Sequence, residues 1–185
     1  MSQRQLKKEL IRLIKKEAFF KQKVVLASGR TSNFYIDIRR ISLTSKGAFL
    51  IANLLWEKLK DEKFDAVGGL TLGADPILSA LAYHAHTKGK SLNTFIIRKT
   101  PKKHGQNRLI EGPILKKGSS VILVDDVATS GGSLVDSIKK LKSLKLKVVK
   151  AFVVVDRREG ATRRIARFKC PLGSLLTLND LTRFR

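Results

Sequence analysis

The spacing of apolar residues separates the first part of the chain into helical and extended segments. Residues 2–17 carry apolar side chains about one helical turn apart, which predicts an amphipathic helix. Residues 24–41 are predicted to be extended, with a turn at Ser28-Gly29. A second helix is predicted over residues 45–60. Two helices are therefore expected to enclose one extended segment.

From residue 66 onward, short apolar runs alternate with helical patterns. The patterns predict strands at 66–70, 94–97, 121–124 and 148–155 and helices at 74–85 and 132–144. Because consecutive parallel strands need helical crossovers, this alternation predicts an α/β fold with a central, mostly parallel sheet flanked by helices on both faces. Ligands of such sheets bind at the carboxyl ends of the strands. The loops expected there begin at Thr71, Arg98, Asp125 and Asp156.

Composition limits the number of domains and the cellular setting. With 185 residues, 43% of them hydrophobic, a single domain spanning residues 1–185 is expected. The chain has no run of about 18 apolar residues, so we expect no membrane span. Residues 1–16 are basic and lack the apolar core of a secretory leader. The single cysteine, Cys170, cannot form an internal disulfide, and together these features predict a cytoplasmic protein.

The net charge of +23 raises the question of nucleic-acid binding. The basic residues are spread along the whole chain, and aromatic residues make up only 6%, which leaves few rings for stacking on bases. Phosphate contacts release counterions, so such a chain adheres to nucleic acid at low salt without any specific site. We therefore expect nonspecific adhesion and no specific nucleic-acid partner.

Residues 121–133, VILVDDVATSGGS, combine three features that together indicate a ligand site. A predicted strand ends at Asp125 and Asp126, and a loop of small and hydroxylated residues precedes the next helix. Backbone N–H groups of such a loop and the dipole of the helix N-terminus suit a monophosphate. The two acids would repel a phosphate, but they can accept hydrogen bonds from hydroxyls or contact a hydrated Mg²⁺. The segment therefore predicts a ligand with both groups, such as ribose 5-phosphate.

The same thirteen residues resemble the phosphoribosyl-pyrophosphate (PRPP) binding motif of the type I phosphoribosyltransferases. The resemblance implies the fold of that family, with a small hood subdomain contributed by about residues 1–40 and 172–185. It implies that Asp125 and Asp126 bind the ribose hydroxyls. It also implies that the 5-phosphate is held by the loop residues Val127, Ala128, Thr129, Ser130, Gly131, Gly132 and Ser133.

Residues 26–40, LASGRTSNFYIDIRR, resemble the hood segment of the orotate phosphoribosyltransferases within that family. In those enzymes an aromatic pair faces the base, which implies that Phe34 and Tyr35 stack on or flank a pyrimidine. The chain departs from the family at Ala27, where some members carry a lysine that contacts the ligands. The hood segment thus points to orotate as the acceptor of the phosphoribosyl group.

Two further segments resemble binding loops of the orotate enzymes. Residues 153–161, VVVDRREGA, imply that Arg157 binds the orotate carboxylate, which a guanidinium fork suits well. Thr129 is implied as an additional contact to the base. Residues 68–77, GGLTLGADPI, resemble the pyrophosphate-binding loop, whose contact positions are Thr71, Leu72 and Gly73.

Residues 98–112, RKTPKKHGQNRLIEG, form a basic segment that resembles the catalytic loop of the orotate enzymes. In that family the loop reaches into the site of the neighbouring subunit, which implies a homodimer. Residues 106–108 depart from the acidic, glycine-rich stretch that is common there. The pyrophosphate contacts implied by the match are Arg98, Lys99, Lys102, Lys103 and His104.

The resemblance implies an enzyme that transfers the 5-phosphoribosyl group from PRPP to orotate, a step of pyrimidine (UMP) biosynthesis. The products are orotidine 5′-monophosphate and pyrophosphate, and the implied cofactor is Mg²⁺, carried mainly by PRPP. A separate orotidine-monophosphate decarboxylase is an expected associate. The implied catalytic residues are Lys99, Lys102, His104, Asp125 and Asp126.

Two alternatives remain open at this point. A phosphoribosyltransferase for another base would share the donor motif, but it would need neither Arg157 nor the hood segment of residues 26–40. A PRPP-sensing regulator that binds nucleic acid would use the positive charge. The basic loop over residues 98–112 counts against the regulator, because a sensor needs no catalytic lid.

Overall fold

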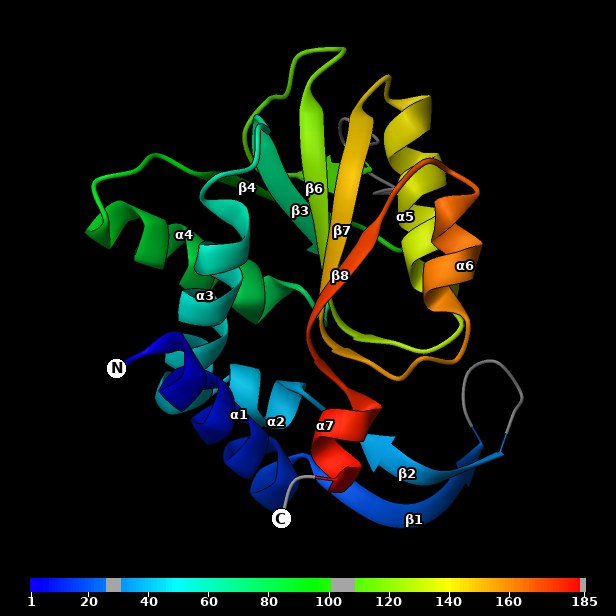
Figure 1. Ribbon diagram of the computed structural model, residues 1–185. Helices are drawn as coiled ribbons and strands as arrows, with labels where there is room; N and C mark the ends of the chain where they lie inside the picture. The colour runs from blue at the N-terminus through cyan, green and yellow to red at the C-terminus, as the bar shows by residue number, and fades with distance from the viewer. Residues whose placement is uncertain (26–30, 101–108, 184–185) are drawn as a thin grey trace.

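The computed structural model describes residues 1–25, 31–100 and 109–183. Its first part comprises α1 (Gln3–Glu17), β1 (Phe19–Val25), β2 (Thr31–Ile36), α2 (Arg39–Ser42) and α3 (Ser45–Leu59). The remainder comprises β3 (Ala66–Leu70), α4 (Asp75–Thr87), β4 (Asn93–Ile97), β5 (Ile110–Glu111), β6 (Ser120–Ala128), α5 (Gly132–Ser143), β7 (Lys147–Asp156), α6 (Ala161–Ala166), β8 (Leu172–Thr177) and α7 (Leu178–Arg183) (Figure 1). Among the described residues, no helix is long and apolar enough to cross a membrane.

The larger sheet has the strand order β5-β4-β3-β6-β7-β8. All neighbouring strands run parallel except β4 and β5, which are antiparallel. The predicted fold class, a mostly parallel sheet flanked by helices, is therefore confirmed. From β3 the chain continues to β4 on one side, whereas from β6 it continues to β7 on the other. This makes the carboxyl ends of β3 and β6 a topological switch point, where open α/β sheets bind their ligands.

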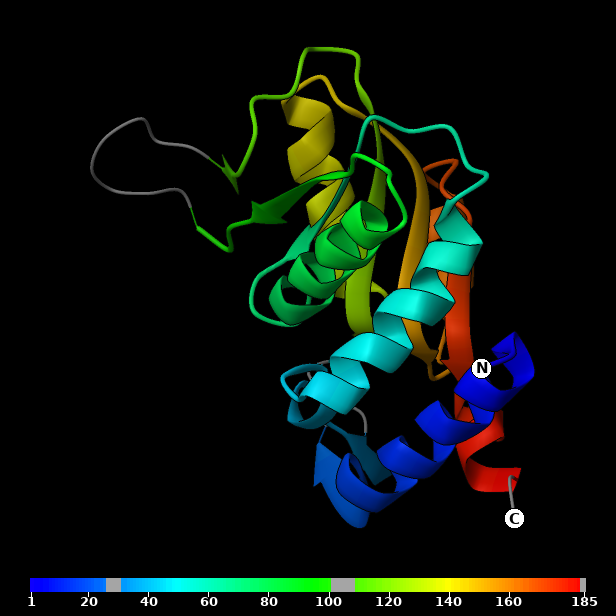
Figure 2. The ribbon, with the colours of Figure 1, turned by 90° about the vertical axis from the view of Figure 1, so that its left-hand side faces the viewer.

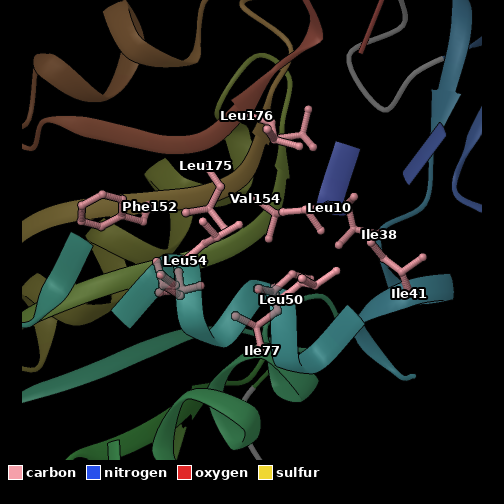
Figure 3. Packing of buried hydrophobic residues seen from close by; sticks show 14 of the residues in the cluster. Leu10, Ile38, Ile41, Leu50, Leu54, Ile77, Phe152, Val154, Leu175 and Leu176 are labelled. Carbon is pink, nitrogen blue, oxygen red and sulfur yellow. The ribbon is translucent and has the colours of Figure 1, made fainter. Parts of the chain in front are cut away.

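Helices cover both faces of this sheet, α3 and α4 on one face and α5 and α6 on the other (Figures 1 and 2). Successive residues of β6 point to opposite faces, so Ile122 joins the core with α1, α3 and α4, and Val121 joins the core with α5 and α6. Figure 3 shows Val154 of β7 in the first core with Leu50 and Leu54 of α3. The two cores pack against both faces of the central strands, whose carboxyl ends form the switch point.

A second layer, formed by α1, α2, α7 and the β1–β2 hairpin, lies below the carboxyl ends of the central strands in Figure 1. The side chains of Ser2 and Gln5 form a capping box that begins α1. At the C-terminus, Asp180 of α7 forms an ion pair of 3.0 Å with Lys7 of α1. β8 pairs with β7, so residues 172–177 belong to the large sheet, whereas α7, the last described element, joins this layer.

The structure differs from the predicted elements where pairing or local hydrogen bonds override the apolar pattern. β6 continues through both acids to Ala128, because Ala128 pairs with Asp156 of β7. The expected extended segment ends early: β2 stops at Ile36, the Asp37 carboxylate accepts from the backbone N–H of Arg39, and α2 begins at Arg39. β5 lies within the segment predicted as a loop, and α6 had no predicted counterpart.

Candidate active site

The loops that follow β3 and β6 meet at the switch point. A Cβ atom added to Gly73 would lie 2.8 Å from Cγ of Asp126, closer than side-chain atoms normally approach. Gly73 therefore lets the loop after β3 lie directly against the acid pair. The structure thus brings Thr71, Leu72 and Gly73 together with Asp125 and Asp126, although more than 50 residues separate them along the chain.

The two acids are held by the backbone at the end of β6. Asp125 is only 8% exposed, and its Oδ1 accepts a hydrogen bond from the N–H of Asp126 at 3.0 Å. The Oδ1 of Asp126 accepts from the N–H of Val127 at 2.7 Å. Both carboxylates keep oxygen lone pairs for a ligand, because a carboxylate accepts up to four hydrogen bonds. The pair can therefore bind vicinal hydroxyl groups.

Burial determines the protonation of this pair. Burial, with the adjacent Asp126 charge, raises the pKa of Asp125 to about 8. Burial also raises the pKa of Asp126, although the backbone N–H of Val127 and the charge of Arg39 act in the opposite direction. At neutral pH and without a ligand, the pair therefore retains a proton. Hydroxyl donors or a cation would favour the ionised form.

The loop after β6 forms the N-terminus of α5. Gly131 adopts a left-handed conformation with φ of 78°, and no side chain caps the first turn of α5 within the described residues. A Cβ on Gly131 would lie 3.0 Å from Cα of Ala161, so the loop lies close against α6. The uncapped N–H groups and the helix dipole suit an anion. The predicted phosphate loop, residues 127–133, is gathered around this helix end.

Two cavities lie on either side of the loop after β3. The larger, about 570 Å³, is lined by residues that include Arg39, Leu72 and Asp75. The smaller, about 380 Å³, is lined by Thr71, Asp75 and Lys99 among others. The Asp75 carboxylate accepts from the Thr71 hydroxyl at 2.8 Å and forms part of both walls. The loop after β3 thus contributes residues to the walls of both cavities.

The start of the predicted catalytic loop lines the smaller cavity. The Arg98 guanidinium forms an ion pair of 2.9 Å with Glu111, and both side chains line this cavity. Lys99 lines the cavity as well. The predicted contacts Lys102, Lys103 and His104 lie outside the described residues, as do Ala27 and residues 106–108.

Arg157 connects the hood hairpin to the end of β6. Its side chain is buried, Nε donates to Glu159 at 2.8 Å, and Nη1 donates to the backbone carbonyl of Phe34 at 3.3 Å. Its backbone N–H donates to the carbonyl of Ala128, next to Thr129. The structure therefore places Arg157, which is predicted to bind the orotate carboxylate, beside both the hood strand β2 and the phosphate loop.

Phe34 and Tyr35 do not present their rings to the same side of β2. The Phe34 ring stacks on Phe19 at a centroid distance of 5.2 Å, and the Tyr35 ring lies 6.2 Å from Phe20. Neighbouring residues of a strand point to opposite faces. One planar base therefore cannot lie against both rings of this strand.

Three residues of the site were not identified from the sequence. Asp75 could have been found, because an acid directly before a proline at the start of a helix, next to a glycine loop, is a recognisable pattern. Arg39 and Lys140 could not. Arg39 acts on Asp126, and Lys140 donates to the backbone at residues 98–99, across long sequence separations.

Comparisons with known proteins agree with this geometry. Residues 40–171 match the phosphoribosyl transferase domain. The chain is 44% identical to the orotate phosphoribosyltransferase of Corynebacterium glutamicum over 173 residues, which cover 94% of this chain and 92% of the relative. The structure of the Mycobacterium tuberculosis orotate phosphoribosyltransferase in complex with PRPP superimposes with a TM-score of 0.77 at 33% identity, covering 95% of this chain and 98% of that one.

A second similar structure belongs to a longer chain. The UMP synthase of Leishmania donovani matches with a TM-score of 0.81 at 29% identity, over 94% of this chain and 36% of that one. Together with the acid pair and the uncapped helix end at one switch point, these matches confirm the family expected from the motifs. The chain belongs to the orotate phosphoribosyltransferases of the phosphoribosyltransferase family.

Proposed function

We propose that the cleft at the ends of β3 and β6 is where this enzyme transfers the 5-phosphoribosyl group from PRPP to orotate. The reaction gives orotidine 5′-monophosphate and pyrophosphate and belongs to pyrimidine biosynthesis. The observation that carries the proposal is that one end of the sheet holds the acid pair, the uncapped N-terminus of α5 and, beside the loop after β3, a cavity whose lining includes Arg98 and Lys99. These three parts match the hydroxyls, the 5-phosphate and the pyrophosphate of a single PRPP molecule.

In this proposal, Asp125 and Asp126 accept hydrogen bonds from the two ribose hydroxyls. The 5-phosphate binds at the loop of residues 127–133, where the first N–H groups of α5 point. The pyrophosphate lies along the loop of residues 71–73 and against the cavity that Lys99 lines. Lys102, Lys103 and His104 would complete its binding site with Arg98.

The acid pair also fits a magnesium ion carried by the substrate. Among the described residues, no group of three histidine, cysteine or acidic side chains could hold a metal ion alone. Mg²⁺ usually keeps several waters and binds through one or two carboxylates together with substrate phosphates. The adjacent carboxylates of Asp125 and Asp126 suit that mode, through water. When bound, the ion would neutralise charge on the pyrophosphate.

The proposed orotate site lies between the hood strand and Arg157. The Arg157 guanidinium binds the orotate carboxylate, and Thr129 contacts the base. Only one of the rings of Phe34 and Tyr35 can stack on the base, because the two point to opposite faces of β2. The hydrogen bond from Arg157 to the Phe34 carbonyl supports this location, because it connects the hood strand to the side chain that is proposed to bind the orotate carboxylate.

The reaction breaks the bond between C1 of the ribose and the pyrophosphate oxygen and forms a bond from C1 to N1 of orotate. Negative charge collects on the leaving pyrophosphate, so catalysis is mainly electrostatic and positional. Lys99 and Lys102 stabilise that charge, and His104 supplies a proton near neutral pH. The proton that orotate N1 loses leaves to solvent.

The proposal includes the setting in which the enzyme acts. We expect a homodimer in which the basic loop of one subunit completes the site of the other. We also expect association with a separate orotidine-monophosphate decarboxylase, an idea supported by the likeness to one part of the longer UMP synthase chain. A cytoplasmic location accords with the single, buried and free Cys170.

The acceptor is tested by offering the enzyme PRPP and Mg²⁺ with orotate, uracil or hypoxanthine and measuring nucleotide formation. Uracil lacks only the carboxylate, so we expect orotate to be used at least about 100-fold more efficiently than uracil. Substituting Arg157→Met should reduce kcat/KM for orotate by about the same factor. Hypoxanthine turnover without orotate turnover would indicate a different base, and no turnover with tight nucleic-acid binding at physiological salt would indicate a regulator.

A further inference from the structure

Lys140 of α5 holds the start of the basic loop, at residues 98–99. Lys140 lies on α5, and its ammonium donates to the backbone carbonyl of Arg98 at 2.8 Å and to that of Lys99 at 2.7 Å. These carbonyls directly follow β4, where the loop begins. A charged donor bonded to two neighbouring carbonyls fixes the direction of the backbone between them, because charge-assisted hydrogen bonds are short and strong.

The other contacts at this point come from the edge of the sheet. The N–H of Arg98 donates to the carbonyl of Leu109, and Ile97 pairs with Ile110 of β5. The Arg98 guanidinium pairs with Glu111. These interactions hold the two ends of the loop to each other. Lys140, in contrast, ties the start of the loop to a helix of the main core.

The contact bears on substrate binding through Lys99. The carbonyl of Lys99 is held by Lys140, while Lys99 also lines the 380 Å³ cavity beside the loop of residues 71–73. α5 itself begins at Gly132, within the loop proposed to hold the 5-phosphate. α5 therefore carries the proposed 5-phosphate site at its first turn. About two turns later it carries Lys140, which holds residues 98–99 beside the proposed pyrophosphate site.

We propose that Lys140 is a positioning residue that holds Arg98 and Lys99 against the pyrophosphate of PRPP, at a fixed distance from the 5-phosphate site. The proposal rests on the PRPP site proposed above and deepens it, since Lys140 touches neither substrate nor reacting atoms. Its ammonium acts through two backbone carbonyls.

The test compares Lys140→Met with Lys139→Met. Lys139 is an exposed neighbour on α5, so its substitution removes the same charge without touching residues 98–99. Calorimetry with PRPP and with ribose 5-phosphate separates the two ends of the ligand, because ribose 5-phosphate has no pyrophosphate. We expect Lys140→Met to weaken PRPP binding about tenfold, as expected for losing a charged hydrogen bond, and to leave ribose 5-phosphate binding within about twofold. Lys140→Arg, which can still donate to both carbonyls, should restore PRPP affinity.

A second measurement is independent of PRPP. Hydrogen–deuterium exchange of residues 93–100 in the free enzyme should be faster in Lys140→Met than in Lys139→Met. If the wild type failed to bind PRPP while this exchange difference appeared, the proposed donor site would be wrong and the anchoring contact would stand. Equal exchange in the two variants, equal PRPP affinity, or an equal loss of ribose 5-phosphate affinity would overturn the positioning role.

Discussion

At the scale of single residues, the buried acid pair is the most unusual feature of the molecule. A carboxylate at 8% exposure beside a second carboxylate is costly to ionise, although Asp125 accepts a hydrogen bond from the backbone N–H of Asp126. Such perturbed groups concentrate at functional sites, because a ligand can supply the missing partners. Ionising the pair therefore costs free energy in the free enzyme, and ribose hydroxyls or a magnesium ion would lower that cost.

The cost of ionising buried Asp125 predicts that the stability of the free enzyme depends on pH. The pKa of folded Asp125 is raised to about 8, while that of an unfolded aspartate is about 3.9, so stability from this group is lost as pH rises through that interval. We expect Asp125→Asn to raise the Tm of the free enzyme above that of the wild type at pH 9, by about 2–4 °C per kcal/mol of burial cost removed. The difference should be much smaller at pH 5 and should vanish only below about pH 3.9, the pKa of an unfolded aspartate.

The control for this measurement is Asp136→Asn, which changes an exposed carboxylate of α5. Thermal unfolding of all three proteins, followed from pH 5 to pH 9, should show the growing difference for Asp125→Asn alone. A difference that did not change with pH would contradict the raised pKa of Asp125.

At the scale of elements, the strands and helices of the central sheet were largely predictable from the sequence. The apolar runs identified β3, β4, β6 and β7, and the centres of β6 and β7 are buried on both faces, which requires continuous apolar residues. The end of β6 was not predictable, since pairing with β7, rather than polarity, carries it past Asp125 and Asp126 to Ala128. β5 could not be predicted either, as its two residues become a strand only by pairing with β4.

The site was predictable wherever a motif is continuous in sequence. The acid pair and the loop at the N-terminus of α5, which lie together at the switch point, were both located in this way. Contacts between elements were not: Gly73 against Asp126, and Arg157 against the carbonyl of Phe34, appear only once the strands are assembled. The opposite directions of Phe34 and Tyr35 follow from strand geometry once β2 is known.

The contact between the two loops predicts the effect of Gly73→Ala. The added Cβ would lie 2.8 Å from the carboxyl carbon of Asp126, so the loop after β3 must move away from the acid pair. We expect KM for PRPP to rise by about tenfold or more, because misplacement by about 1 Å is costly in a catalytic site.

Gly173→Ala provides the contrast, since its Cβ would meet the Phe152 ring at 2.4 Å, in a core away from the site. This variant should lower Tm while KM for PRPP stays unchanged. A normal KM for PRPP in Gly73→Ala would show that the two loops do not form one binding surface.

At the scale of the whole molecule, the excess of positive charge affects both the assembly of the proposed dimer and the attraction of anions. A net charge of +23 makes like chains repel, yet it also draws polyanions and the triply phosphorylated donor toward the cleft. Salt screens these long-range effects within about 10 Å at 0.1 M ionic strength. Dimer assembly should therefore strengthen, and adhesion to nucleic acid weaken, as salt is raised to physiological levels.

Action of the basic loop in trans can be tested with mixed dimers. A variant with Lys102→Ala and His104→Ala lacks the loop function, and a variant with Asp126→Asn lacks the ribose site. After subunit exchange, each mixed dimer would contain one intact site, so we expect about a quarter of wild-type activity from two inactive proteins. No recovery despite proven exchange would place the loop in its own subunit's site.

The central claim is that the acid pair at the switch point binds PRPP for transfer to orotate. The most direct measurement is the amount of orotidine 5′-monophosphate formed from PRPP, Mg²⁺ and saturating orotate by the wild type and by the Asp125→Asn, Asp126→Asn double variant. We predict equal amounts of orotidine 5′-monophosphate and pyrophosphate from the wild type, and a turnover reduced at least about 1000-fold in a variant that remains folded. Comparable turnover by the two proteins, or none by the wild type, would contradict the account.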